Sequence, residues 1–528
     1  MGASGGVSLR TSRSDLDLME ISPDAVATAH VHMALGLMHP NGVVRTAWFR
    51  GGGYDEAIVE APLPSREGGV HDLLLLVPDE TELFSSPWMA EAYRDIQRRI
   101  YRGGIAYVLL PPNHRSSVRR QLRAAGLACE PYVHSSRGAR PSFVAPMTAG
   151  ALRSAVDHTV WLSPRMRVLC GRGSRLRLVR WGLERFAPTL GYLVHAREQL
   201  PFGWLSQFAP GLPDSYDVVI RPSWRGRSGA GMLQCVSRRR DRPSLIVKVA
   251  HSEGAADSVR REHENLNRFG GSATRAGARV ADVITNARVN GLHVHVQTAL
   301  DGVPAALALR RSPDHIVTVI DLLGGWLHRW NGSTAVVQTV TEGHVAKWLR
   351  KPLEHLRTEG YPLGSYERQL EGLIATISGM CLPVVPAHSD LTMTNVLIDR
   401  SRRLGIVDWE VAESEALPLT DFFYSVTDAI VAAHGMSRQE SFQAGFARNG
   451  RYRRITGRWM LRLAAGLDLP GSAVELALHT CWLHHARNEA AKRRTTGQRP
   501  YWELLCWLAR NPDSVPLPGV VDAGGGRM

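Results

Sequence analysis

The sequence predicts a chain of two structural classes, an α/β domain with a mostly parallel sheet followed by an α+β domain built of two lobes. Three observations in the 528 residues support this prediction. Short apolar runs alternate with helical stretches up to about residue 200, and residues 201–213 are rich in Pro, Gly and aromatic side chains. After this break, three strand-like segments precede a long helical one. Strand–helix alternation is typical of parallel sheets, and strands grouped ahead of helices are typical of α+β domains.

These patterns divide the chain into five segments. Residues 1–23 are a Gly-, Ser- and Arg-rich leader and residues 513–528 a tail that contains Gly-Gly-Gly, and both are expected to be flexible. The α/β domain is expected at 24–205. The first lobe of the second domain is expected at 215–302, and its helical second lobe at 303–512.

Composition and charge narrow the classes of function. Hydrophobic residues make up 44% of the chain and charged residues 21%, which excludes a wholly disordered or collagen-like protein. The formal net charge of +14 favours anionic partners such as phosphates, although a GC-rich genome explains the high arginine content equally well. Seven arginines within 165–185 fit an anionic ligand or, alternatively, a solvated surface. No nucleic-acid-binding module is recognisable, so no specific nucleic acid partner is expected.

Cysteine usage and hydropathy bear on location. The six cysteines lie far apart and form no CxxC pair or Cys/His cluster, so we expect no zinc site and reduced thiols, as in a cytoplasmic protein. No apolar run reaches the 18 or more residues that a membrane-spanning helix needs. The N-terminus lacks the apolar core of a signal peptide. The sequence therefore predicts a cytoplasmic protein with no membrane span.

The first domain is expected to contain two buried strands, Asp72–Val77 and Ile105–Leu110. One helix is expected between them at 88–102, and another after the second strand at 116–125. This strand–helix–strand order resembles the later half of a Rossmann-type methyltransferase domain, which implies a mostly parallel, Rossmann-like sheet. The glycine cluster Gly51–Gly53 lacks the G-x-G-x-x-G spacing of a nucleotide-binding turn. A surviving cofactor site and a simple tight turn both remain open.

A lysine within an apolar strand is the first sign of chemistry in the second domain. Lys248 lies in the strand expected at Leu245–Val249, and Glu262 lies fourteen residues later in a helix expected at Gly254–Phe269. Burying a lone charge is costly unless an opposite charge meets it. Kinases use such a strand lysine and helix glutamate to hold the α- and β-phosphates of ATP. A lysine that extends to solvent from an edge strand is the alternative.

The segment His388-x-Asp390-Leu391-x-x-x-Asn395, followed thirteen residues later by Asp408-Trp409-Glu410, carries the strongest signal. Phosphoryl transfer from ATP needs one carboxylate at the acceptor hydroxyl and hard oxygen ligands for Mg²⁺. Asp390 fits the first role, and Asn395 and Asp408 fit the second. The alternative is that His388 and Asp390 cap a turn while Asp408 ends a strand. Carboxylates between apolar strands are costly without cations, which favours the catalytic interpretation.

Residues of about 215–510, which contain these motifs, resemble the aminoglycoside phosphotransferase and choline kinase-like enzymes, a family of small-molecule kinases. The resemblance rests on His388, Asp390, Asn395 and the run Ile406–Glu410, with Pro418-x-x-Asp421 following at a spacing common in the family. It implies an α+β bilobal, protein-kinase-like fold. It also implies ATP, or another nucleoside triphosphate, and Mg²⁺ as cofactors.

The resemblance assigns a role to each motif residue. Asp390 is expected to be the catalytic base and Asn395 and Asp408 the metal ligands, with His388 and Glu410 in support. Lys248 and Glu262 are expected to order the phosphates. The segment 295–300 is expected to lie beside the adenine, with main-chain groups offered around Gln297 and Thr298.

Three departures from the family pattern keep a weakened or inactive enzyme open. Ser389 stands where the family has glycine, Thr392-Met393-Thr394 stands where His-Pro-Gly is common, and the loop 222–231 lacks the G-x-G-x-x-G order. None of them removes a charged catalytic group.

The leading hypothesis is therefore an ATP-dependent phosphotransferase that acts on a hydroxyl group of a small molecule. The alternatives are a catalytically inactive nucleotide-binding scaffold and a bifunctional protein with a live N-terminal transferase domain. Acidic residues after the metal motif fit a cationic or a polyhydroxylated acceptor, and the sequence leaves the acceptor open. Helices are expected at 315–330 and 366–380 and again within 439–510, where the aromatic residues are interpreted as core and His484 and His485 as ordinary helix residues.

Overall fold

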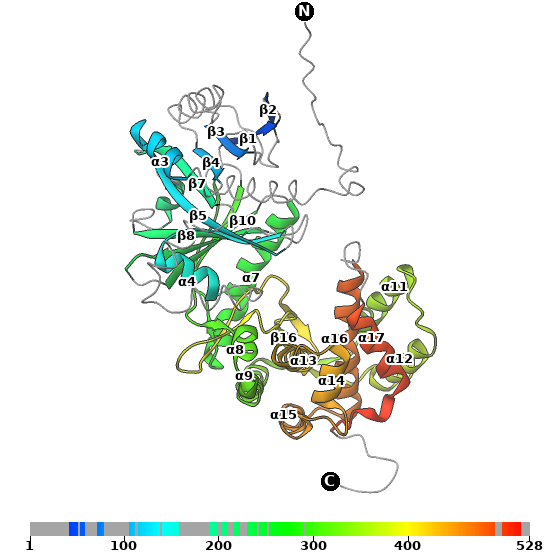
Figure 1. The fold of residues 1–528 in the computed structure, drawn as a ribbon. Helices are drawn as coiled ribbons and strands as arrows, with labels where there is room; N and C mark the ends of the chain where they lie inside the picture. Colours follow the sequence, from blue (N-terminus) through cyan, green and yellow to red (C-terminus); the bar gives the residue numbers. More distant parts are fainter. Residues whose placement is uncertain are drawn as a thin grey trace, which may run out of the picture. The chain divides into compact units, whose positions relative to one another are not determined.

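The structure is a computed structural model, and the described residues are 42–50, 53–58, 71–78, 105–110, 115–137, 140–157, 190–197, 202–208, 215–221, 230–239, 242–250, 253–289, 292–491 and 499–518. The predicted leader, the helix expected at 88–102, the arginine-rich stretch 165–185 and most of the glycine-containing loop after residue 221 lie outside them. The chain divides into two compact units, coloured along the sequence in Figure 1. The sheet unit comprises Met1–Arg260 and Val283–Ala299, and the helical unit comprises Arg261–Asp282 and Leu300–Met528. The domain limits predicted from the sequence stay a prediction.

The described part of the sheet unit is built on one 12-stranded sheet with the order β12-β13-β10-β9-β8-β6-β5-β7-β4-β3-β1-β2. Its strands are β1 (Gly42–Arg50), β2 (Gly53–Ile58), β3 (His71–Pro78), β4 (Ile105–Leu110), β5 (Leu127–Arg137), β6 (Arg140–Pro146), β7 (Leu190–Ala196), β8 (Tyr216–Arg221), β9 (Ala230–Ser237), β10 (Arg242–Ala250), β12 (Val283–Val289) and β13 (Leu292–Thr298). The unit also contains the helices α3 (Arg115–Ala124) and α4 (Ala149–Asp157) and the 3₁₀ helix η4 (Gly203–Gln207).

The prediction of a Rossmann-like, mostly parallel sheet is wrong. Only the pairs β1–β3 and β3–β4 are parallel, and each of the other described pairs in this sheet is antiparallel. The short link between Arg137 and Arg140 explains part of the difference, because it joins β5 to β6 as a hairpin, whereas parallel neighbours need a long crossover. The strands expected at 72–77 and 105–110 do exist as β3 and β4, but β4 pairs on its other side with the antiparallel β7.

Two apolar clusters hold the sheet unit together. The larger one joins side chains of β8, β9, β10 and β13, including Leu233, Val247 and Val296, and η4 contributes Leu205. The smaller one packs Ala151 and Ala155 of α4 against strands β6, β8 and β9. In β8 the four central residues are all buried, which is the pattern of a strand covered on both faces.

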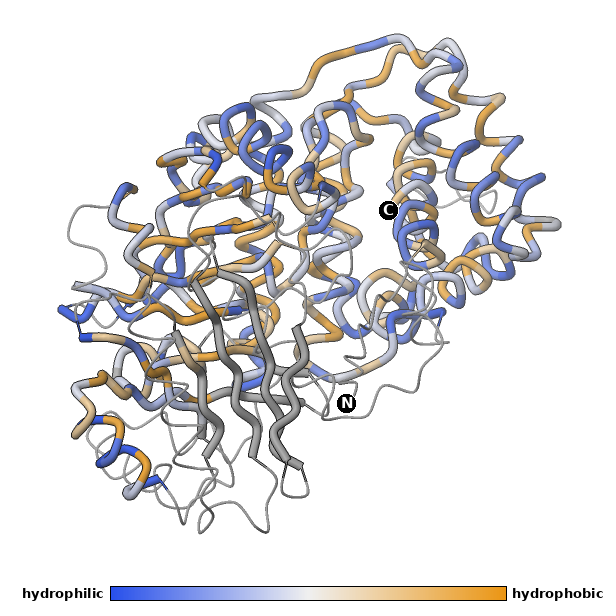
Figure 2. The backbone as a smooth tube through the Cα atoms, turned by 90° about the horizontal axis from the view of Figure 1, so that it is seen from above, coloured by the Kyte–Doolittle hydropathy of each residue, from blue (hydrophilic) through white to orange (hydrophobic). Residues whose placement is uncertain are grey.

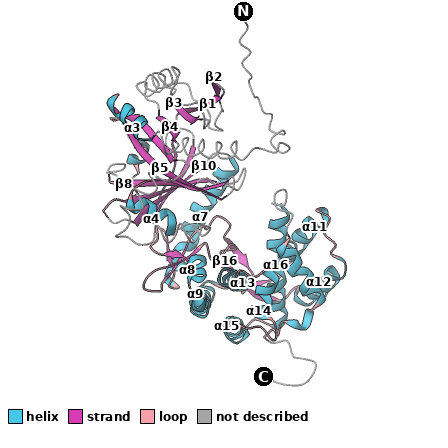
Figure 3. Cartoon of the chain, in the orientation of Figure 1, coloured by secondary structure: helices cyan, strands magenta, loops and turns pink. Residues whose placement is uncertain are grey.

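The described part of the helical unit contains α7 (Glu253–Arg275), which starts within the sheet unit, α8 (Ala305–Arg311), η6 (Pro313–His315), α9 (Ile316–Thr334), α10 (Glu342–Val345), the π-helical turn η7 (Ala346–Arg350), α11 (Lys351–Thr358), α12 (Gly364–Ile377), α13 (Thr420–His434), α14 (Arg438–Phe446), α15 (Arg453–Ala465), α16 (Gly471–Ala491), α17 (Pro500–Arg510) and η9 (Pro512–Ser514). Helices predominate in this unit (Figure 3). Most of them show hydrophobic and hydrophilic stretches in turn along the coil, as amphipathic helices do (Figure 2). The helices expected at 315–330 and 366–380 are confirmed as α9 and α12.

Two small sheets accompany these helices. One has the order β11-β18-β17-β14 and the other the order β15-β16-β19. Their strands are β11 (Arg279–Val280), β14 (Val303–Pro304), β15 (Val336–Thr339), β16 (Cys381–Ala387), β17 (Val396–Ile398), β18 (Leu404–Ile406) and β19 (Glu413–Ala416). The loop between β16 and β17 carries the His-x-Asp motif, and β18 leads into Asp408.

Helix α13 forms the centre of the helical unit. Twelve of its fifteen residues are buried, which is expected only for a helix surrounded by other elements. The indole rings of Trp326 and Trp330 stack at 5.0 Å on α9, and Trp330 meets Trp409 edge to face at 5.7 Å. The aromatic residues interpreted as core are thus partly confirmed, because Trp482 is fully buried and Trp459 and Trp502 nearly so. In the described part of the chain, no helix combines the length and the hydropathy needed to cross a membrane.

Candidate active site

The loop that follows β16 is fixed at its start by a buried carboxylate. The main-chain N–H of His388 donates to Asp421 Oδ2 at 2.7 Å, and that of Ser389 donates to Oδ1 at 2.9 Å. Ser389 has a φ of 62°, the left-handed conformation that glycine adopts most easily. Burial raises the pKa of Asp421 to about 7, while the two N–H donors act in the opposite direction. Both oxygens of this carboxylate are therefore used to hold the loop.

The ring of His388 links this loop to the segment that contains Asp408. His388 is fully buried, and its Nε2 lies 3.0 Å from the carbonyl oxygen of Val407. A carbonyl oxygen can only accept a hydrogen bond, so Nε2 carries the proton. The ring also packs against the edge of Trp409 at 4.9 Å. His388 thus connects the loop to the segment that contains Asp408, and its supporting role stays a prediction.

Asp390 and Asn395 lie together, as the motif predicted. The side-chain amide of Asn395 donates to the main-chain oxygen of Asp390 at 2.9 Å and to Asp390 Oδ2 at 3.1 Å. The main-chain oxygen of Asn395 accepts a bond from the N–H of Val407 at 3.0 Å, next to Asp408. The strands β17 and β18 pair as a hairpin between these two points. The motif residues Asp390, Asn395 and Asp408 are thus carried by one continuous, hydrogen-bonded substructure.

The turn after β18 is held by α7. Asp408 has a φ of 69°, and the indole N–H of Trp409 donates to the carbonyl oxygen of Ile406 at 3.1 Å. The side-chain amide of Asn265 donates to the carbonyl oxygens of Trp409 and Ala412 at 2.8 and 3.1 Å. Glu262, which is buried, lies one helical turn before Asn265 and therefore on the same face of α7. Glu410 follows Trp409 in this turn.

The residues present suit a magnesium ion by their chemistry. Because the amide nitrogen of Asn395 donates to Asp390, its Oδ1 is the atom left to act as a ligand. An amide oxygen and the Asp408 carboxylate are hard oxygen donors, and Mg²⁺ is usually bound by one or two such groups together with phosphates and water. Among the described residues, no group of three His, Cys, Asp or Glu side chains is arranged to hold a metal. Two oxygen ligands such as these would suit an ion that also binds phosphate oxygens and water.

A second buried carboxylate holds the other end of the same loop, and the sequence analysis missed it. The N–H of Met393 donates to Asp428 Oδ2 at 2.6 Å. The other oxygen of Asp428 pairs with Arg438 at 2.6 Å, and the Arg438 guanidinium lies over the rings of Tyr424 and Tyr501 at 5.8 and 5.3 Å. The nearby Asp428 keeps the pKa of Arg438 raised despite its burial. The seven-residue spacing from Asp421, two helical turns on one face of α13, was a signal for this role.

The sheet unit carries Lys248, Gln297 and Thr298, three of the four residues predicted to bind the nucleotide. Lys248 on β10 lies opposite Met232 of β9 and His295 of β13. Gln297 is buried, and its side-chain oxygen lies 3.1 Å from Nε2 of His295, so its side chain belongs to the core. Thr298 ends β13. Lys248 belongs to the sheet unit and Glu262 to the helical unit, so their ion pair stays a prediction.

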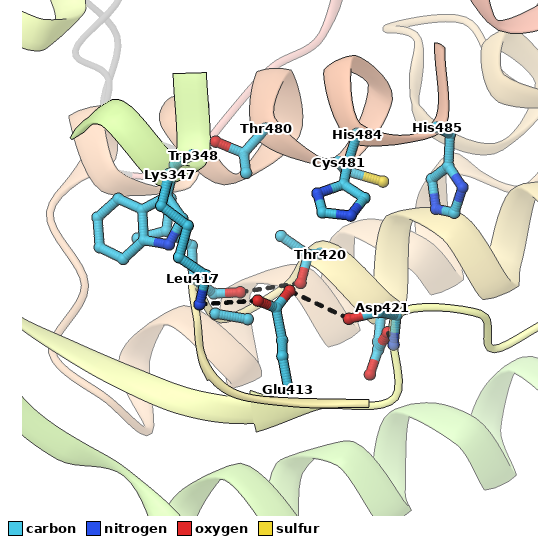
Figure 4. Close-up of a pocket in the computed structure, with 12 residues that line it drawn as sticks. Lys347, Trp348, Glu413, Leu417, Thr420, Asp421, Thr480, Cys481, His484 and His485 are labelled. Atoms are coloured by element: carbon cyan, nitrogen blue, oxygen red, sulfur yellow. Dashed lines mark hydrogen bonds and ion pairs between the residues drawn. The ribbon is translucent and has the colours of Figure 1, made fainter. Parts of the chain in front are cut away.

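A pocket opens beside the start of the loop, within the helical unit (Figure 4). It encloses about 460 Å³ of empty space, open solvent at its mouth included. On one side lie Glu413 and Asp421, and on the other the α16 residues Thr480 and His484. Ser389 also lines the pocket. Lys347 of η7 forms an ion pair with Glu413 at 2.8 Å. His484 was interpreted as an ordinary helix residue, and the structure places it in the wall of this pocket.

Comparisons with known proteins identify the family of this region. A family model described as the phosphotransferase enzyme family matches residues 230–458. Similar solved structures include the apo form of a thermostable mutant of aminoglycoside phosphotransferase APH(4)-Ia, with 12% identity over 59% of this chain and 100% of that chain and a TM-score of 0.40. The GDP complex of aminoglycoside 2'-phosphotransferase-IIIa has 15% identity over 58% and 97% of the two chains and a TM-score of 0.37.

No curated protein matches the chain. The resemblance of the first domain to methyltransferases is not shown by these comparisons. The family match begins within β9 and ends within α15, so it includes Lys248, Glu262, Asp390, Asn395 and Asp408. Residues 230–458 are therefore similar to the phosphotransferase enzyme family.

Proposed function

We propose that this protein is an ATP-dependent phosphotransferase that moves the γ-phosphate to a hydroxyl group of a small molecule. The observation that carries the proposal is the substructure of 388–408, in which Asn395 holds Asp390 and connects it through Val407 to Asp408. The family match of residues 230–458 supports a transferase of the kinase type. Turnover on the order of 1–100 per second is usual for such enzymes.

Each residue then has one task. Asp390 accepts the proton of the acceptor hydroxyl as that oxygen attacks the γ-phosphorus, and the bond to the β-phosphate oxygen breaks. Asn395 and Asp408 hold Mg²⁺, which when bound neutralises phosphate charge. Lys248, paired with Glu262, positions the α- and β-phosphates, and main-chain groups near Gln297 and Thr298 receive the adenine. His388 and Glu410 support the loop and the turn.

The serine at position 389 is compatible with this function. Ser389 adopts a positive φ, which glycine adopts freely and which costs about 1 kcal/mol for a side chain. Its hydroxyl donates to Glu413 Oε1 at 3.1 Å, which offsets part of that cost. The loop thus accommodates Ser389, one of the departures that motivated an inactive scaffold.

Substitution of the proposed base tests the function. Asp390→Ala should leave ATP binding, measured by thermal shift, largely unchanged and should abolish transfer of phosphate from γ-³²P-ATP to an acceptor. The matched control is Asp399→Asn in the turn between β17 and β18, where the carboxylate is bonded to Arg403 at 2.9 Å rather than to the motif. An Asp390→Ala protein with wild-type transfer would refute the proposal.

A further inference from the structure

The pocket between α16 and the 413–421 segment, which we name the α16 pocket, allows the acceptor to be described more closely. We propose that the α16 pocket binds the acceptor and that it selects an uncharged polyhydroxylated molecule, of the sugar or cyclitol type, over a polycationic one. This inference rests on the proposed phosphotransferase function. Its evidence lies in the position, the charges and the hydrogen-bonding groups of the pocket.

Position connects the α16 pocket to the proposed base. Ser389, which directly precedes Asp390, contributes to the wall, and so does Asp421, whose carboxylate holds the main chain of Ser389. An acceptor hydroxyl must come within hydrogen-bond reach of its general base. The wall of this pocket includes Ser389, the residue next to Asp390.

The carboxylates of the pocket are already occupied. Glu413 receives Lys347 at one oxygen (2.8 Å) and the hydroxyl of Ser389 at the other (3.1 Å). Asp421 receives main-chain N–H groups at both of its oxygens. A cationic acceptor needs carboxylates that can face its ammonium groups, and each of these two would first have to give up a partner. The pocket therefore lacks the excess of negative charge that a polycation requires.

The opposite wall offers neutral hydrogen-bonding groups from α16 (Figure 4). Burial lowers the pKa of His484 to about 4, so the ring is uncharged at neutral pH. An Arg487 N–H group lies 2.9 Å from Nε2 of His484 and can only donate, which places the proton of the ring on Nδ1. The hydroxyl of Thr480 is buried and has no hydrogen-bond partner within the described residues. Such groups pair with the hydroxyls of an uncharged ligand.

Long-range charge agrees with this interpretation. The chain carries a net charge of +14, which lowers the local concentration of cations around it.

An acceptor comparison with the full-length protein tests the inference. Purified protein is given γ-³²P-ATP and Mg²⁺ with myo-inositol, D-glucose or D-ribose as uncharged probes, and with choline or kanamycin as cationic probes. We expect at least one uncharged probe to be phosphorylated with a kcat/KM tenfold or more above either cation. A preference for choline or kanamycin would overturn the inference, and so would transfer to none of the uncharged probes by a protein that hydrolyses ATP.

Two variants locate the selectivity in the α16 pocket. Thr480→Val removes the unpartnered hydroxyl while it keeps the shape, and it should raise KM for the phosphorylated probe about five- to tenfold with KM for ATP unchanged. Ser441→Ala is the matched control, since its hydroxyl is equally buried and unpartnered among the described residues but does not line the pocket. Lys347→Met frees Glu413 and should shift the ratio of kcat/KM values towards choline about tenfold. An unchanged KM in Thr480→Val together with an unchanged ratio in Lys347→Met would reject the assignment.

The failure of the proposed function is distinguishable from that of this inference. If the wild-type protein shows no Mg²⁺-dependent turnover of ATP, the function fails. The α16 pocket is then tested by saturation-transfer NMR with myo-inositol and kanamycin. Binding of myo-inositol that Thr480→Val weakens supports the selectivity, and binding of kanamycin alone or of neither probe contradicts it.

Discussion

Lys248 and Asp390, two residues of the proposed site, are held in place by different physical means. Lys248 lies within β10, where ladder pairing to β9 and β13 and the surrounding apolar cluster define its position. Asp390 lies in a loop whose two ends are bound by the carboxylates of Asp421 and Asp428. The first arrangement depends on many equivalent contacts, and the second depends on a few specific ones.

This difference predicts how each region responds to substitution. Removing one apolar side chain from the sheet should lower stability while the position of the strand persists, because the remaining ladder bonds still define it. Removing one anchoring carboxylate should change the geometry of the loop more than the stability of the unit. The following experiments test this contrast, from the largest expected effect to the smallest.

The largest effect is expected at the proposed metal ligand. Asp408→Ala should abolish Mg²⁺-dependent nucleotide binding, because Asn395 alone cannot hold the ion, and transfer should fall by more than about a thousandfold. Isothermal titration of ATP with and without Mg²⁺ measures this. Asp468→Ala is the matched control, because it removes another aspartate with a positive φ from an exposed position. Nucleotide binding that still depends on Mg²⁺ in Asp408→Ala would contradict the assignment.

Next in size is the response of the sheet to a cavity. Leu233→Ala in β9 should lower the free energy of unfolding by about 2–5 kcal/mol, because Leu233 is fully buried in the larger apolar cluster. The kcat of the protein that remains folded should stay near the wild-type value. Denaturant unfolding and activity per folded molecule measure the two quantities. The control is Ile284→Ala in β12, where the side chain is 42% exposed, and it should change neither stability nor kcat. If Leu233→Ala loses kcat in proportion to stability, the two regions do not differ as proposed.

Substitution of Asp428, which anchors the loop, should lower activity more than stability. Asp428→Asn keeps the size of the side chain but weakens the bonds to Met393 and Arg438, so kcat should fall about ten- to a hundredfold with KM for ATP little changed. Amide hydrogen exchange of the peptide that contains Met393 should become faster. Asp321→Asn is the control, since this carboxylate pairs with Arg458 at 2.5 Å without contact to the loop. A variant with unchanged kcat and unchanged exchange would show that Asp428 is merely structural.

The smallest effect is a dependence of stability on pH in the helical unit. Burial lowers the pKa of His479 to about 4 from its ordinary 6.5. The folded state therefore binds fewer protons between pH 4 and 6.5, so this contribution to stability is complete above pH 6.5 and is lost as the pH falls towards 4. Between pH 7 and 5.5 the free energy of unfolding of the wild type should fall by about 1 kcal/mol more than that of His479→Asn. Chemical denaturation measures this difference. An equal fall in the free energy of unfolding of the two proteins would contradict the lowered pKa of His479.

The parts that sequence reasoning predicted well are local ones. The strand expected at Ile105–Leu110 is confirmed with its predicted bounds, because an apolar run between turn residues defines it within a few positions. The partners Asp390 and Asn395 are five residues apart and meet in the structure as the spacing required. Short-range geometry of this kind is encoded in spacing alone.

The parts that were missed depend on contacts between distant residues. The direction of strand pairing in β4–β7 joins residues about 85 positions apart, and a strand–helix pattern does not reveal it. Asp428 lies 35 residues from its partner Met393. His484 and its α16 neighbours face pocket residues that come from 347–421, so the position of His484 in the α16 pocket follows from the packing of α16 against distant segments.

The contact of α4 with the sheet has a practical consequence for work on this protein. Strands β6 and β8 pair at Val144 and Ile220, and Ala151 and Ala155 of α4 pack in one cluster with Val219 and Val236. A truncated chain that starts at residue 215 would lack β6 and α4. The apolar edge of β8 would then be exposed to water. Exposed edges of this kind template aggregation. A shortened chain for expression should therefore begin ahead of β5, so that it includes the β5–β6 hairpin and α4.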